Sequence, residues 1–419
     1  MAEAQIIDPT PKFTFDRGVA MVTWPDMPPF GISMLFRSIR TDRRSDEVHA
    51  EIQVHVGTNG AVGDQIHRGR LNLSSLRAQG ETAKFLEHQV HGPDWPARLA
   101  QASWLVVDAQ KVGRPPIVLR DTQAPPGGRY VLPPILLAAQ PVILFGDGGM
   151  WKSYFALLAA LSIHTGKEIV PGLVPTAKLN VAYVDFEWEP WPHKARMAAL
   201  YGPDSQPDLL YVPAAAEGPL AHQVDRLRTI VRDRRIGYIV LDSVGMACDG
   251  PPEDAVVALA FFQALSRLEV GSLLLAHTNR SEDQGKPFGS TFWHNSARAT
   301  WFMKKVQEAG TKAIDVALYN KKPANDGPKE MPIGLHVNFA VAPTVVTRQD
   351  LTAVVGLASG LSLKDQMLDA IGSGALSIKA LALQLGKSEQ VVRNEFLDWE
   401  GKAFKRLPGT PYLVTKLNQ

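Results

Sequence analysis

Hydrophobic and polar residues alternate along two stretches in the first quarter of the chain. Residues 32–36 and 48–56 place an apolar side chain at about every second position. A period of two is typical of a β-strand with one buried face. Helical spacing of apolar residues follows at 82–88 and 95–107. The pattern predicts a small α+β domain over residues 1–120, and it leaves the role of that domain open.

The pattern changes after residue 132, where short apolar runs alternate with helical segments. Several of these runs are apolar throughout, as strands covered on both faces require. This alternation is typical of a mostly parallel sheet flanked by helices. We predict such a domain over residues 132–346, between linkers at 121–131 and 347–361. Its candidate strands are 141–145, 180–184, 209–212, 236–241, 272–276, 300–304, 314–319 and 334–339.

The last segment, residues 362–419, has the spacing of three helices followed by a hairpin. Helices are expected at 363–371 and 389–400. Residues 377–388 between them have the pattern of a helix, a turn and the cap of the next helix, and the hairpin is expected at 403–414. This order looks like a winged helix, in which the third helix enters a DNA major groove. Arg393 would then contact DNA from that helix, and Lys405 and Arg406 from the wing. Winged helices also dock proteins, so a protein partner stays open.

Composition restricts the choice of partners and of compartment. The 419 residues include 44 lysines and arginines against 42 aspartates and glutamates, so any basic surface must be local. The single cysteine, Cys248, fits a reducing cytoplasm. We find no signal peptide and no apolar run of the roughly 18 residues that cross a membrane. A cytoplasmic protein that makes no membrane contact is expected.

A glycine-rich segment joins the first strand of the central domain to an apolar helix. It comprises Gly146, Asp147, Gly148, Gly149, Met150, Trp151, Lys152, Ser153 and Tyr154. Glycines let backbone N–H groups turn inward, and a helix N-terminus adds positive potential, so this order suits a phosphate cradle. Lys152 would reach the β- and γ-phosphates of ATP, and the Ser153 hydroxyl would bind Mg²⁺.

One position departs from the usual phosphate-loop pattern. Trp151 stands where the pattern G-x-x-x-x-G-K-[ST] has its second glycine. The backbone must tolerate a Cβ there, and the ring must point away from the phosphates. Nucleotide binding with weakened hydrolysis therefore stays as an alternative to full turnover.

Two later strands end in acids. The apolar residues 239–241 are followed by Asp242, which would hold the water shell of Mg²⁺. Residues 181–184 run into an acidic turn, where Glu187 would orient the attacking water. Asp185 and Glu189 are its neighbours, and a solvated acidic turn is the alternative.

Together, residues 130–345 resemble the RecA-superfamily P-loop ATPases, in particular the RepA-like and DnaB-like hexameric replicative helicases of plasmids and phages. An acid follows the second strand in that family, as Glu187 does here. Residues 276–280 resemble the family's sensor motif and place His277 in the sensor position. Gly289 and Ser290 resemble the Gly-Ser pair after a mobile loop. The resemblance implies a RecA-like fold.

The resemblance also implies a ring of subunits, expected to be hexameric, with ATP at each interface and a positive charge donated by the neighbour. Candidates for that charge are Arg298, Lys321 and Lys322. The family's Lys-x-Arg motif is Lys-Lys here, so the assignment stays open. A surface salt bridge is the alternative for each.

Two loops would face the pore of such a ring, residues 245–253 and 280–288. Arg280 and Lys286 in the second loop would touch a DNA backbone, unless the loop is plain surface.

The sequence therefore predicts an ATP- and Mg²⁺-dependent DNA motor, a RepA-like helicase or replication ATPase. Its partners would be single-stranded DNA, and duplex DNA through the C-terminal domain. A RecA/RadA-type recombination ATPase shares the same site and is one alternative. A nucleotide-gated DNA-binding regulator with weak hydrolysis is the other.

Overall fold

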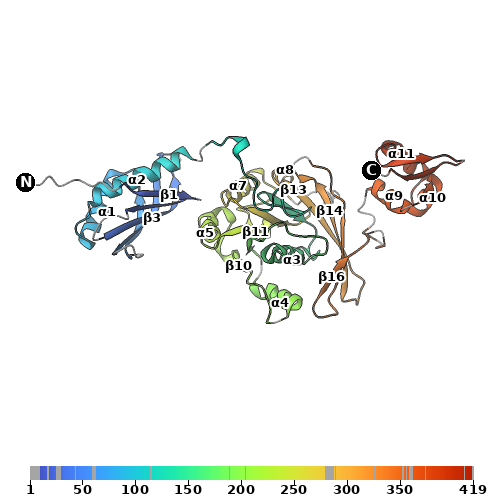
Figure 1. Cartoon of the computed structure of the whole chain (residues 1–419), viewed down its shortest axis with the longest axis horizontal. Coiled ribbons are helices and arrows are strands. Elements are labelled where there is room, and N and C mark those ends of the chain that lie inside the picture. Colours follow the sequence, from blue (N-terminus) through green and yellow to red (C-terminus); the bar gives the residue numbers. More distant parts are fainter. Residues whose placement is uncertain are drawn as a thin grey trace, which may run out of the picture. The chain divides into compact units, whose positions relative to one another are not determined.

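The computed structural model divides into two compact units. Figure 1 labels their helices and strands. The first unit contains residues 1–123, 222–234 and 267–269, and the second contains the rest. The structure describes residues 10–16, 18–24, 30–42, 44–58, 63–113, 116–187, 189–202, 204–278, 287, 289–324, 327–351, 353–354, 356–357, 362–372, 374–409 and 411–417. Within these ranges no helix is long and apolar enough to cross a membrane.

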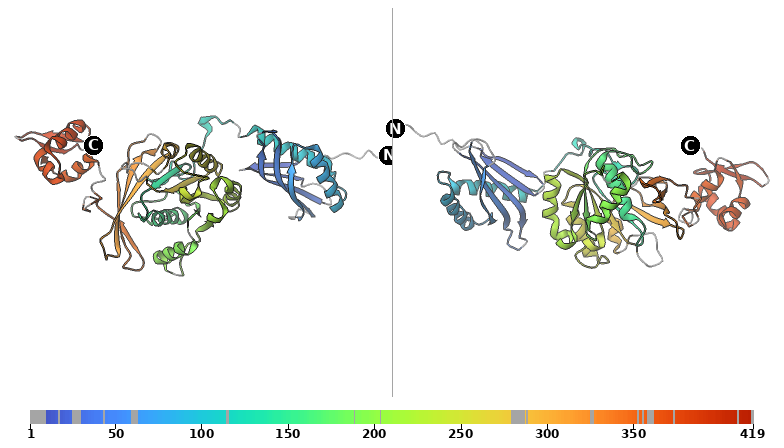
Figure 2. Two further views of the ribbon diagram at one scale, coloured as in Figure 1. Left: turned by 180° about the vertical axis from the view of Figure 1, so that it is seen from behind. Right: turned by 90° about the horizontal axis from the view of Figure 1, so that it is seen from below.

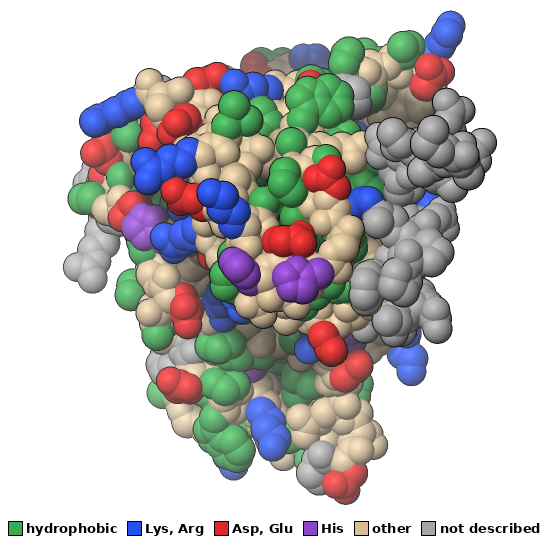
Figure 3. Space-filling view, turned by 90° about the vertical axis from the view of Figure 1, so that its left-hand side faces the viewer, with side chains coloured by type: hydrophobic (Ala, Val, Ile, Leu, Met, Phe, Trp, Pro, Cys, Tyr) green, Lys and Arg blue, Asp and Glu red, His purple; other side chains and the backbone are tan. Residues whose placement is uncertain are grey.

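The N-terminal part is a five-stranded antiparallel meander in the order β1-β2-β3-β4-β5. Two helices, α1 and α2, cover one face of this sheet (Figures 1 and 2). Figure 3, which views the molecule from the left-hand side of Figure 1, shows acidic and basic side chains interspersed. The bounds are β1 Lys12–Asp16, β2 Val19–Trp24, β3 Phe30–Thr41, β4 Val48–Thr58, β5 Asp64–Asn72, α1 Leu76–Gln89 and α2 Trp95–Val112.

The alternation of buried and exposed residues along the strands explains why the helices pack on one face of the sheet. Ala20, Val22 and Trp24 are fully buried, and the residues between them are exposed or half-exposed. The buried side packs against apolar side chains of the helices, including Leu86 and Leu99. Caps fix where the helices begin, because Ser75 accepts from the N–H of Ala78 and Asp94 from that of Ala97.

The central part is a nine-stranded sheet in the order β10-β9-β11-β12-β8-β13-β14-β15-β16. The first six strands in this order, from β10 through β9, β11, β12 and β8 to β13, pair in parallel. Strands β14, β15 and β16 then add antiparallel pairs next to β13. This confirms the predicted mostly parallel sheet. The bounds are β8 Pro141–Phe145, β9 Asn180–Asp185, β10 Leu210–Pro213, β11 Ile236–Asp242, β12 Gly271–Ala276, β13 Ala299–Val306, β14 Ala313–Lys322, β15 Ile333–Asn338 and β16 Val345–Arg348.

Helices and a small hairpin complete the central part. The helices are α3 Lys152–Thr165, α4 Pro190–Tyr201, α6 Val244–Ala247, α7 Ala255–Ser266 and α8 Thr291–Ser296, and the hairpin is β6 Tyr130–Leu132 with β7 Leu136–Leu137. Helix α5, Leu220–Asp233, follows β10 in the chain, and its residues from 222 onward belong to the first unit. Two short 3₁₀ turns span Leu119–Asp121 and Ala215–Glu217. The hairpin and the first turn lie at the ends of the predicted linker 121–131.

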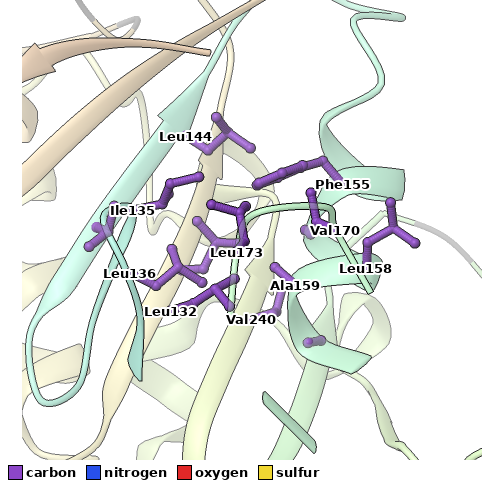
Figure 4. Close-up of a cluster of buried hydrophobic side chains, with 14 of the residues drawn as sticks. Leu132, Ile135, Leu136, Leu144, Phe155, Leu158, Ala159, Val170, Leu173 and Val240 are labelled. Carbon is purple, nitrogen blue, oxygen red and sulfur yellow. The ribbon is translucent and has the colours of Figure 1, made fainter. Parts of the chain in front are cut away.

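Helix α3 is apolar almost all round because it is buried between the sheet and the hairpin. Phe155, Leu158 and Ala159 are fully buried, and they pack with Leu132, Ile135, Leu136, Leu144, Val170, Leu173 and Val240 (Figure 4). A helix anchored in this way gives the loop before it a rigid base.

The C-terminal segment has the predicted order of three helices and a hairpin. Strand β17 adds a third strand to the hairpin, in the order β17-β19-β18. Met367, Leu381, Val392 and Phe396 form a core of their own. The bounds are α9 Leu363–Ile371, β17 Leu376–Ser377, α10 Ile378–Leu385, α11 Glu389–Trp399, β18 Phe404–Leu407 and β19 Leu413–Lys416.

Candidate nucleotide site

Four parallel strands end at one edge of the central sheet. Asp185 at the end of β9 pairs in register with Asp242 at the end of β11. Ala276 at the end of β12 pairs with Phe145 at the end of β8. The segments that follow these strands carry the glycine-rich loop, Glu187, Ser243 and His277. The topology therefore gathers the predicted chemical groups from four separate stretches of sequence.

The loop between β8 and α3 requires glycine where the backbone runs close to a neighbour. A Cβ on Gly146 would lie 2.6 Å from the carbonyl oxygen of Met303. Gly149 has φ +73°, a left-handed conformation that L side chains rarely adopt. An added Cβ on Gly148 or Gly149 would meet nothing within 4 Å, so the loop faces open space. This space suits a phosphate chain.

Trp151 adopts a left-handed backbone with φ 70°. The phosphate-loop pattern has glycine here because that conformation crowds a Cβ. The indole ring stacks on Tyr154, with the centroids 5.0 Å apart and the planes 14° from parallel. Trp151 also packs against the core around α3. Packing of the ring thus offsets the strain of the backbone.

Lys152 is folded onto the loop that precedes it. Its Nζ donates to the carbonyl oxygens of Gly146 and Asp147, each at 2.8 Å. Burial lowers the pKa of its amine, and the carboxylates of Asp242, Glu187 and Asp147 oppose that shift. The cation lies at the N-terminus of α3, where phosphate oxygens are favoured. Phosphate would replace the two carbonyls as its partner.

Asp242 is 2% exposed and bound on two sides. The Tyr183 hydroxyl donates to its Oδ2 at 2.7 Å, and the Ser153 side chain also hydrogen-bonds it. Burial raises the pKa of this carboxyl, and the Ser153 and Tyr183 hydrogen bonds oppose the rise. Ser153 and Asp242 therefore present two hard oxygens side by side, which fits Mg²⁺.

The described residues hold no group of three or more His, Cys, Asp or Glu that would bind a metal unaided. Mg²⁺ characteristically binds through one or two carboxylates together with water and substrate phosphates. The donor set of Ser153 and Asp242 fits a metal that arrives with a nucleotide.

Glu187 is held by two neighbours at the ends of β11 and β12. The Ser243 hydroxyl donates to its Oε1, and His277 Nε2 lies 3.9 Å from the same oxygen. His277 foremost, with help from Ser243 and Lys152, lowers the pKa of Glu187, although burial opposes this. The side chain is 27% exposed. Glu187 is thus an oriented carboxylate, ionised at neutral pH and still reachable by water.

Asp185 differs from Glu187 although the sequence placed them together. Its side chain is fully buried, and it accepts from the N–H of Glu187 and contacts His193 Nε2, both at 2.8 Å. Asp185 therefore supports the turn that carries Glu187 and is closed to substrate water.

The sequence did not predict several residues whose hydrogen bonds hold the site side chains in place. Thr278 donates to the Asp147 carboxylate and so ties the end of β12 to the glycine-rich loop. Ser243 follows the predicted Asp242 directly, which is the one signal that pointed to it. Tyr183 and His193 carry no local signal, because their partners are distant in the chain.

The three candidates for the donated charge lie toward the other end of the sheet. Thr300 pairs with Lys322, and Ala299 pairs with Val142 near the start of β8, so Arg298 and Lys322 lie far from the glycine-rich loop. Lys322 Nζ donates to the carbonyls of residues 294, 295 and 297 at 2.8, 2.9 and 2.6 Å. Lys321 Nζ lies 5.6 Å from the centroid of the Phe302 ring. The Arg298 side chain is exposed.

The predicted DNA contacts have different surroundings. Arg280 and Lys286 lie outside the described residues. Arg393 and Lys405 are exposed. Arg406 donates to both carboxylate oxygens of Glu400 at 3.1 and 3.0 Å and lies 4.3 Å from the Tyr412 ring centroid. The predicted loop 245–253 overlaps the short helix α6.

A glycine-rich loop that leads into a buried lysine, with carboxylates at the neighbouring strand ends, defines a P-loop ATPase domain. Residues 110–283, less than half of the chain, match the family model for an AAA domain. The matched segment includes Lys152, Glu187, Asp242 and His277 and ends before Arg298. No curated protein matches the chain in sequence.

Proposed function

We propose that the chain is an ATP-hydrolysing DNA motor, a replication ATPase similar to the RepA-like and DnaB-like helicases, which acts as a ring. One arrangement of side chains supports this function above all. An ionised, half-buried Glu187, backed by Ser243 and His277, stands at the same sheet edge as Lys152 and Asp242. A simple nucleotide-binding module needs no such carboxylate.

Binding of ATP follows from the loop. Lys152 would exchange its two carbonyl partners for oxygens of the β- and γ-phosphates, and the N-terminus of α3 would add N–H donors. Ser153 and Asp242 would hold Mg²⁺, which supplies neutralisation of phosphate charge when bound. Tyr183 keeps the Asp242 carboxylate fixed through its 2.7 Å hydrogen bond.

Hydrolysis is an in-line attack of water on the γ-phosphorus. The bond from the water oxygen to phosphorus forms as the bond to the bridging oxygen breaks, which yields ADP and phosphate. Glu187 would accept a hydrogen bond from that water and orient it, and general-base help of this kind contributes roughly 10²–10⁴-fold. His277, beside Glu187, would respond to the loss of the γ-phosphate.

The proposed ring would add a second cation to the one, Lys152, that the described residues place at the site. Among the described residues that the sequence suggested as cations, Lys152 lies at the phosphate edge, whereas Arg298 and Lys322 lie at the other end of the sheet. Lys322 is already held by three carbonyls and Lys321 lies over the Phe302 ring, so we assign the donated charge to the exposed Arg298 of a neighbouring copy. An arginine supplied in trans accelerates phosphoryl transfer by about 10³–10⁵.

Mixing inactive subunits tests this assignment. Lys152→Ala subunits keep Arg298, and Arg298→Ala subunits keep an intact loop, so a mixture should regain part of the ATP turnover. Mixing Lys152→Ala with Glu187→Gln should regain none, because both defects lie in the same half of the site. Equal, negligible turnover in both mixtures would contradict donation by Arg298.

Unwinding is tested separately by ATP-dependent displacement of a labelled strand from a forked duplex. Displacement by the wild type, absent in Lys152→Ala, is the expected result. ATP hydrolysis without strand displacement would show that the protein is an ATPase and would contradict the helicase function.

A second candidate is a nucleotide-gated DNA-binding regulator, favoured by the strained Trp151 backbone in the loop. It predicts tight ATP binding with negligible turnover, whether or not DNA is present.

A further inference from the structure

The N-terminal sheet has one face that the helices α1 and α2 leave uncovered (Figures 1 and 2). Strand registers show which side chains share this face. Met21 pairs with Leu35, which pairs with Gln53, which pairs with Arg68. Within the described residues of β2 to β5, all four of these side chains are exposed or half-exposed. Two apolar side chains, Met21 and Leu35, therefore lie in one row with two polar side chains on the open face.

A second row on this face is strongly basic. Arg37 pairs with Glu51, which pairs with Arg70, and Arg40 follows Arg37 on the same strand. Together with Arg68 this places four arginines around one glutamate on the described parts of β3 to β5. The chain as a whole carries a formal net charge of only +2, so the face concentrates positive charge.

The strands are distorted at the centre of this basic row. The register of β3 against β4 shifts between Arg37 and Arg40, and Ser38 has φ 51°. Such a bulge bends the strand and redirects its side chains. The result is a hollow of about 280 Å³, lined by Ser38, Arg40, His49, Ala50, Glu51 and Arg70.

Arg37 next to the hollow has an unsatisfied donor. Its Nε is buried and finds no acceptor among the described residues. A buried donor without a partner costs about 1–3 kcal/mol, more for a charged group. An acceptor from outside the chain would remove that cost. Arg40, in contrast, is engaged with Asp225 at 3.0 Å in the same compact unit and is 70% exposed.

We propose that this face binds a single-stranded polynucleotide, with backbone phosphates at the hollow and bases against Met21 and Leu35. Charge complementarity selects a polyanion, and arginine forks bind phosphate oxygens well. Strand β3 of 12 residues and strand β4 of 11 residues form a surface roughly 35 Å long. A single strand can lie flat along such a sheet and turn its bases toward it, as nucleic-acid-binding sheets allow.

This site goes beyond the proposed ATPase function and does not depend on it. The P-loop domain hydrolyses ATP, whereas the sheet would hold the strand whether or not nucleotide is present. Binding is therefore measured without ATP, and in a Lys152→Ala background as well.

The experiment is fluorescence anisotropy of a labelled oligo-dT with the full chain at several salt concentrations. Arg37→Gln with Arg70→Gln should weaken binding about tenfold and lower the slope of log affinity against log salt by about 1 for each arginine. Arg77→Gln is the matched control, because Arg77 is an exposed arginine on α1 paired with Glu81, off the open face. It should bind as the wild type does.

Glu51→Gln is a second variant, which separates a loss of phosphate contacts from a loss of folding. Removing the one acid of the row should tighten binding, which damage to the fold would not do. Unchanged affinity in the double variant, or no tightening in Glu51→Gln, would overturn the proposal. Equal affinity for a blunt duplex would also overturn it, and oligo-rU beside oligo-dT shows which of the two sugars is preferred.

Discussion

The Ser243 hydroxyl donates a hydrogen bond to Oε1 of Glu187, and it thereby joins the ends of strands β9 and β11. Ser243 directly follows Asp242, which Ser153 and Tyr183 hold. Glu187, which would position water, is thus held by the residue next to Asp242, which would bind metal. Movement of β11 relative to β9 would disturb both.

The fall of kcat for ATP hydrolysis at low pH, the acid limb of the pH profile, should depend on His277. Because His277 foremost and Ser243 next lower the pKa of Glu187, this carboxylate stays ionised to lower pH than in the unfolded chain. The associated stabilisation is present above the unfolded pKa and is lost as pH falls through the folded one. His277→Gln raises the folded pKa, so the acid limb of kcat should move to higher pH.

Ser243→Ala should move that limb in the same direction by less. Glu189→Gln is the control and should leave its position unchanged. The measurement is kcat as a function of pH for the four proteins. An acid limb that stays in place in His277→Gln would show that Glu187 does not govern turnover.

Substitutions of Trp151 separate backbone strain from ring packing. Trp151→Gly and Trp151→Ala both lose the stack on Tyr154, but only glycine accepts φ 70° without strain. We expect both variants to be less stable than the wild type, with alanine the worse by about 1 kcal/mol. Denaturant unfolding measures the difference. Equal stability of the two variants would mean that the loop relaxes around a Cβ.

Two glycines of the loop should respond differently to alanine. A Cβ on Gly146 would lie 2.6 Å from the Met303 carbonyl, whereas one on Gly148 meets nothing within 4 Å. Gly146→Ala should lose about 1–3 kcal/mol of stability because β8 and β13 must move apart. Gly148→Ala should stay within about 0.5 kcal/mol. Thermal unfolding without nucleotide compares them, and similar losses would argue against the described approach of the two strands.

Much of the central fold could be predicted because its signals are local. Strands such as β8 and β12 are apolar runs, as burial on both faces demands, and the glycine-rich loop stands between a strand and a helix. The N-terminal sheet was predicted only in part. Strand β5 carries polar residues on both faces, so alternation does not reveal it.

The hydrogen bonds that hold the site side chains in place could not be predicted, because they depend on which strands lie side by side. Thr278 meets Asp147 only because β12 lies beside β8. Lys322 resembled a catalytic cation in sequence, and its three carbonyl partners come from the end of α8, which only the fold brings near.

The most direct test of a hydrolytic site coupled to DNA is steady-state ATP turnover with and without single-stranded DNA. Wild-type turnover should rise when DNA is added. Lys152→Ala and Glu187→Gln should each lower it at least about a hundredfold, with ATP binding kept in Glu187→Gln. ATP binding without turnover, unchanged by DNA, would contradict the motor and mark Trp151 as part of a nucleotide switch.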